Sequence, residues 1–147
     1  MGAEFWGLRR RLPGRLPGDV CANAAIEFAL VAPVFLVFLM GIISYGGYFW
    51  LAHNLQELAN DSARAAVGGL TADERSAFAR SSFDSQVASY GALTPARANV
   101  VYNGTAQNFT VSVSYDASRS GFWAISGLIP MPSSTIVRTA SIRLGGY

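Results

Sequence analysis

Charged residues and cysteines are scarce in this chain of 147 residues. Only 14% of the residues are charged, lysine is missing so that all 11 basic residues are arginines, and Cys21 is the single cysteine. One cysteine excludes an internal disulfide. A net charge of +2 excludes the strongly basic face that is typical of nucleic-acid binding. Hydrophobic residues, at 51%, are too many for an ordinary soluble domain of this size.

The sequence also has little that could carry catalysis. His53 is the only histidine, and no partner follows it at metal-ligand spacing. No nucleophile elbow, phosphate-binding loop, metal cluster or paired-carboxylate site is visible, and the adjacent Asp73 and Glu74 belong to a helix start. Cys21 follows no apolar run and is interpreted as a bystander thiol. We therefore expect no enzyme, no cofactor and no metal site.

A long apolar run stands near the N-terminus. Between Ile26 and Leu51 the only ionisable groups are Glu27 and two tyrosines. As a helix this run would be roughly 39 Å long, enough for a tilted crossing of a bilayer core of about 30 Å. We expect one transmembrane helix over residues 23–51. Three aromatic residues near its end fit the belt at the far interface: Tyr45, Tyr48 and Trp50.

Arginines gather on one side of the predicted span. Residues 1–22 carry Arg9, Arg10, Arg11 and Arg15 against two acids, whereas beyond Leu51 seven arginines face six acids. This asymmetry indicates an N-terminus in the cytoplasm. Residues 1–22 would form a cytoplasmic leader, and residues 52–147 a domain on the periplasmic side of the inner membrane.

Two helices are predicted before any strand. The first begins with Asn23 as its N-cap, continues beyond the span to about Val67 and ends at a pair of glycines. The second opens with a capping box over residues 71–74 and closes by Gly91 and Pro95. Its predicted buried residues are Phe78, Ala79, Phe83, Val87 and Tyr90.

After residue 98 the apolar period changes to two. Val100 and Tyr102 lead to Asn103-Gly104, a hairpin signal. Residues 109–115 alternate apolar and polar side chains, as in a half-buried strand, and residues 136–144 suggest a last strand in which Arg138 breaks the alternation. The fold class is therefore α+β: a long N-terminal helix, a second helix and a small antiparallel sheet packed on the amphipathic half of the first helix.

The first half of the chain resembles the TadE-like pseudopilins of the tight-adherence (Tad, or Flp) type IV pilus system. The likeness rests on AAIEFALVAPVFL over residues 24–36, GII over residues 41–43, YG at residues 45–46, LQELA over residues 55–59 and ARAA over residues 63–66. The second half is similar only in layout. The resemblance implies a pilin-like fold.

The resemblance also implies roles for residues at the start of the span. In pilin-like proteins a prepilin peptidase cuts five residues before the conserved glutamate, and the new amine pairs with that glutamate on a neighbouring subunit. Here the cut would fall between Ala22 and Asn23, with Ala22 where the family has glycine, and Glu27 would be the pairing carboxylate. The alternative is that Glu27 is a charge at headgroup level with no task.

Pro33 lies inside the predicted span. It removes the hydrogen bond to the carbonyl of Ala29 and should kink or loosen the helix there. Two interpretations stay open: a weak point used when the protein leaves the membrane, or a tolerated membrane proline.

The favoured function is a minor pseudopilin with a structural role in pilus assembly. The implied partners are other pilins and pseudopilins, the inner-membrane pilus platform, a prepilin peptidase and membrane lipid, but no nucleic acid. One alternative is a Sec-exported domain cut after Gly46. Another is a membrane-anchored binding domain with no pilus role.

Overall fold

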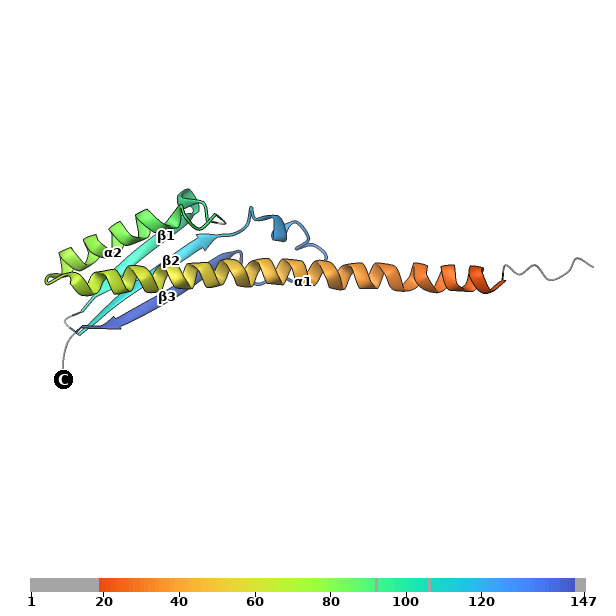
Figure 1. Cartoon of the computed structure of the whole chain (residues 1–147), viewed down its shortest axis with the longest axis horizontal. Helices are drawn as coiled ribbons and strands as arrows, with labels where there is room; N and C mark the ends of the chain where they lie inside the picture. The colour runs from red at the N-terminus through yellow and green to blue at the C-terminus, as the bar shows by residue number, and fades with distance from the viewer. Residues whose placement is uncertain (1–18, 92, 106, 145–147) are drawn as a thin grey trace, which may run out of the picture. The chain divides into compact units, whose positions relative to one another are not determined.

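The computed structural model describes residues 19–91, 93–105 and 107–144 (Figure 1). The four leader arginines therefore lie outside the described residues. The chain divides into two units, Met1–Phe38 and Leu39–Tyr147. The described part of the first unit is helical, and the second unit holds all of the strands.

The element order is two long helices followed by three strands, which confirms the predicted α+β layout. Their bounds are α1 (Asp19–Ala65), α2 (Ala72–Val87), β1 (Ala98–Gly104), β2 (Asn108–Asp116) and β3 (Thr135–Arg143). Three short 3-10 turns connect them, at Ala66–Gly68, Pro95–Arg97 and Gly121–Trp123.

Helix α1 begins earlier than predicted. It starts at Asp19, so Asn23 is an exposed residue inside the helix and its prediction as N-cap is wrong. No glycine or proline occurs between residues 19 and 32 to delay the start, and an acidic residue is favourable in a first helical turn. At the other end, α1 passes into a 3-10 turn that closes at Gly68, next to the predicted end at Val67.

Helix α2 opens with the predicted capping box. The Thr71 hydroxyl accepts a hydrogen bond from the Glu74 backbone N–H at 3.2 Å. The Glu74 carboxylate in turn accepts from the backbone N–H groups of Leu70, at 2.8 Å, and Thr71, at 3.2 Å. These two bonds hold the pKa of Glu74 below its usual value. Three donors at the helix start are thus satisfied by two side chains.

Replacing Thr71 by alanine is expected to lower the free energy of unfolding by about 1 kcal/mol, because the Glu74 N–H loses its acceptor. Urea unfolding of the full chain in detergent, followed by tryptophan fluorescence, measures this loss. Ser81→Ala is the matched control, since Ser81 is exposed on the same helix and its hydroxyl makes no hydrogen bond to any described residue. Equal losses from both variants would contradict the capping role.

The buried stripe of α2 is narrower than predicted. Ala79, Phe83 and Val87 are buried at four-residue steps, as expected, and Tyr90 is half-buried. Phe78 is 47% exposed, so its predicted burial is wrong. One residue along a helix turns a side chain by about 100°, which carries Phe78 off the stripe.

Strand β2 is the centre of a three-stranded antiparallel sheet with the order β1-β2-β3. Its alternation is as predicted: Phe109, Val111, Val113 and Tyr115 are buried, while the residues between them are half-buried. On the outer face, hydroxyls pair across β2 and β3, Thr110 with Ser141 at 2.6 Å and Ser112 with Thr139 at 2.8 Å. The sheet therefore has one apolar and one polar face.

The hairpin turns one step later than Asn103-Gly104. These two residues belong to β1, paired with Thr110 and Phe109, so their prediction as the turn is wrong. The turn is closed by Thr105, whose N–H donates to the Asn108 carbonyl at 2.7 Å and whose hydroxyl accepts the Asn108 N–H at 3.0 Å. A turn in which a threonine hydroxyl accepts a backbone N–H can form in place of a turn at Asn-Gly.

One core joins both helices to the apolar face of the sheet, as predicted. Figure 1 shows α2 and the later part of α1 lying along the strands. The largest fully buried side chains include Leu51, Leu55 and Leu58 of α1 with Phe109 and Tyr115 of β2. On β3, Ile136 and Ala140 are buried, and the half-buried Arg138 between them turns its guanidinium to the Val137 carbonyl, at 2.8 Å.

Candidate membrane and assembly segment

The first half of α1 carries a long apolar run whose side chains are mostly exposed. By length and composition α1 is the one helix, among the described residues, that could cross a membrane. Its large apolar side chains are exposed, with Phe28 at 72%. A buried helix of a soluble core would hide them, so this segment needs an apolar environment that the described residues do not supply.

Glu27 stands near the start of this exposed apolar segment. Its side chain is exposed and makes no hydrogen bond or ion pair with any described residue. Ala22 and Asn23, the predicted processing site, lie one turn earlier on the same helix and are also exposed. Pro33 lies inside α1, which continues past it, and the kink there stays a prediction.

The glycines of α1 admit a close neighbour that sequence reasoning missed. A side chain on Gly47 would meet the Phe122 ring at 2.9 Å, and one on Gly41 would meet Ile129 at 3.6 Å. Between them, the Tyr45 hydroxyl donates a hydrogen bond to the Pro130 carbonyl. The apolar connection 121–130 therefore lies along the end of the apolar run in α1. The small residues of α1, which allow close packing, are the sequence feature that could have predicted this contact.

The side chain of His53, just past the apolar run, lies beside a carboxylate of the same helix. Its Nε2 lies 3.3 Å from a carboxylate oxygen of Glu57, one turn further along α1, and both side chains are largely exposed. Within the described ranges there is no group of three or more histidine, cysteine, aspartate or glutamate residues that could hold a metal ion.

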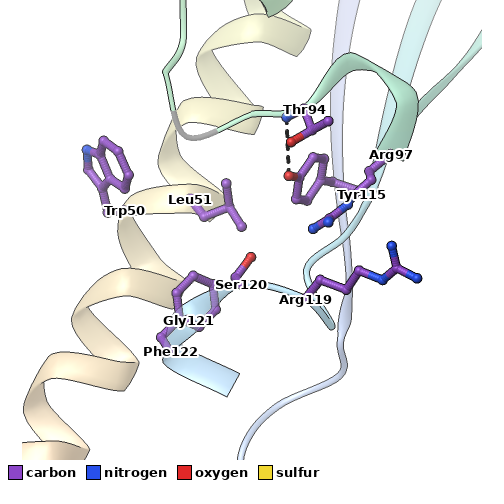
Figure 2. Close-up of a pocket in the computed structure, with 9 residues that line it drawn as sticks. All are labelled: Trp50, Leu51, Thr94, Arg97, Tyr115, Arg119, Ser120, Gly121 and Phe122. Carbon is purple, nitrogen blue, oxygen red and sulfur yellow. Dashed lines mark hydrogen bonds between the residues drawn. The ribbon is translucent and has the colours of Figure 1, made fainter. Parts of the chain in front are cut away.

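A cleft of about 370 Å³ opens beside Trp50, where the apolar run ends. Figure 2 shows it between α1 and two loops, with Arg97 entering it below Tyr115 and Arg119 on its rim. The Tyr115 hydroxyl accepts a hydrogen bond from the Thr94 N–H at 3.3 Å. The remaining lining residues are Leu51, Ser120, Gly121 and Phe122.

The cleft carries uncompensated positive charge. Neither Arg97 nor Arg119 forms an ion pair within the described part of the chain. The one acid that both arginines influence is Asp116, which accepts the Ser118 N–H at 2.9 Å. That hydrogen bond holds the pKa of Asp116 below its usual value, and the two arginines lower it further. Two cations against one anion leave the cleft with a net positive charge.

Comparison with known protein families matches residues 23–64 to the family described as TadE-like protein. No curated protein and no solved structure matches the chain. The matched residues contain the exposed apolar segment, Glu27, Pro33 and the part of α1 that enters the core. Residues 23–64 are thus TadE-like, as their pattern predicted, and the N-terminal apolar helix that they form fits a membrane anchor.

Proposed function

We propose that this chain is a minor pseudopilin of a tight-adherence type IV pilus, with a structural rather than an enzymatic role in pilus assembly. The observation that carries the proposal is the exposed apolar segment of α1 with one carboxylate near its start. Such a segment serves equally as a membrane anchor and as a surface for packing against the helices of other pilins.

Glu27 supplies the specificity of that packing. A carboxylate near the edge of a span costs free energy, up to about 3 kcal/mol at the centre, so it is favoured when a cation neutralises it. Cleavage between Ala22 and Asn23 creates such a cation, the amine of Asn23. The helix holds the Asn23 amine one turn from Glu27 of the same chain. A neighbouring subunit that lies alongside can therefore place its own Glu27 carboxylate against this amine.

The partners that follow are other pilins and pseudopilins, the inner-membrane platform and a prepilin peptidase. The leader arginines favour an N-terminus in the cytoplasm and a second unit in the periplasm. In that position the compact unit is available to other subunits of the machine or of the filament.

Sequencing the N-terminus of the mature protein tests this proposal. We expect Asn23 as the first residue, because the peptidase would accept a small side chain at Ala22. Ala22→Gly should be processed as well, whereas the bulky Ala22→Trp should keep its leader. A first residue of Gly47 would instead identify a Sec-exported domain, and an intact leader in the unaltered chain would identify an anchored domain with no pilin processing.

A further inference from the structure

We propose that the second unit binds one anionic phospholipid of the membrane leaflet next to it, with the phosphate between Arg97 and Arg119 and an acyl chain in an apolar groove beside α1. The inference starts from two hollows that adjoin. The arginine-lined cleft and a groove of about 530 Å³ share Gly121 and Phe122 as lining residues.

The groove is apolar where the cleft is charged. It lies between Met40, Ile43 and Gly47 of α1 and Ile125 of the connection 121–130. Gly47 is essential to its shape, because a larger residue there would strike Phe122. A hollow with an apolar end and a cationic end is complementary to an amphiphile with an anionic head.

The two ends also have the order that a lipid requires. The groove uses residues 40–47, which belong to the apolar run, while the cleft uses Trp50 and Leu51, where that run ends. Along a helix the step from Ser44 to Leu51 is about 10 Å, toward the aqueous side. A phospholipid lying along α1 would therefore place its acyl chain at the level of the bilayer core and its phosphate at the level of the headgroups.

The cationic end suits a phosphodiester. Arginine binds phosphate oxygens with two parallel N–H groups. Arg97 is half-buried and Arg119 is exposed, and neither would lose an ion pair with a described residue on binding a phosphate. The cleft stays net positive with Asp116 counted, so it favours a headgroup with a net negative charge, such as glycerol phosphate, over one in which a choline cation neutralises the phosphate. Trp50, 58% exposed on the rim, is typical of a side chain at the lipid headgroup level.

Native mass spectrometry of the full chain, released from detergent micelles, measures the lipid bound. The probe is dioctanoylphosphatidylglycerol. We expect one molecule per chain, with a Kd about tenfold lower than that of dioctanoylphosphatidylcholine, because the two arginines repel the choline cation and one charged interaction is worth about that factor. Inorganic phosphate at the same concentration should displace little of the lipid, because it leaves the groove empty.

Pairs of variants test the arginine-lined cleft and the apolar groove separately. Arg97→Gln with Arg119→Gln should weaken phosphatidylglycerol binding about tenfold or more, whereas Arg80→Gln with Arg143→Gln, which removes equal charge from α2 and β3, should change it less than about twofold. Ile125→Asn should weaken the lipid, and Leu128→Asn, on the same connection but outside the groove, should not.

Three results would overturn the inference. Equal binding of the two lipids by the unaltered chain would mean that lipid partitions onto the apolar surface without recognition of its headgroup. This measurement does not depend on whether any variant folds. Phosphate that competes as strongly as the lipid would mean a site for a free anion. A dimer that takes up no lipid would mean that a second copy covers the groove. The lipid site requires that α1 lies in a membrane, but it does not require that the leader is cleaved. An experiment can therefore contradict the lipid site without contradicting the pseudopilin proposal, and the reverse.

Discussion

Replacing Glu27 by leucine is expected to abolish pilus assembly while leaving membrane insertion intact. Insertion should become slightly easier, because a carboxylate no longer has to leave water. Leader cleavage should persist, since the peptidase would read Ala22. Assembly should fall at least about tenfold, because the Asn23 amine of the neighbouring subunit would remain in lipid without its counter-charge. Counting pili and crosslinking the chain to other pilins in membranes measures this loss.

Two further variants sharpen this prediction. Glu27→Asp should restore assembly only in part, because the shorter side chain moves the charge by roughly one C–C bond and an ion pair in a medium of low dielectric constant is sensitive to distance. Glu57→Gln removes a carboxylate from the same helix beyond the apolar run and should leave assembly unchanged. If Glu27→Leu assembles normal pili in cells where deletion of the gene abolishes them, the pairing role is wrong.

Replacing Val111 by aspartate is expected to unfold the second unit. Val111 is fully buried at the middle of β2, between the sheet and the helices. An aspartate there would hold an unpaired charge in the core and would remove apolar contacts, a loss of roughly 4 kcal/mol or more in the free energy of unfolding. That is a large fraction of the total for a unit of this size. Limited proteolysis of the full chain in membranes should show rapid digestion.

The matched control is the same substitution on the outer face. Val101 lies on β1, is 47% exposed and pairs with Ser112, next to Val111 in the sequence. Val101→Asp should reduce stability by less than about 1 kcal/mol, because its carboxylate stays in water. If Val111→Asp accumulates and resists protease as the unaltered chain does, the assignment of the buried face of β2 is wrong.

Local patterns predicted those elements in which neighbouring residues decide the conformation. The capping box formed as predicted because Thr71 and Glu74 satisfy donors only three residues away. Strand β2 formed as predicted because a strict alternation over seven residues fits only a sheet with one buried face. The errors concern boundaries and single faces, where alternatives differ little in free energy: the start of α1 at Asp19, the exposed Phe78, and the hairpin that turns at Thr105.

The sequence by itself determined the apolar helix, its single carboxylate, the α+β layout and the likeness to TadE-like proteins over residues 23–64. These properties follow from periodicity and from the order of residues along one segment. Only the tertiary structure decided that the connection 121–130 lies against the glycines of α1 and that Arg97 and Arg119 line one cleft beside Trp50. Residues that are far apart in the sequence approach one another through packing of a shared core, which no local pattern of residues encodes.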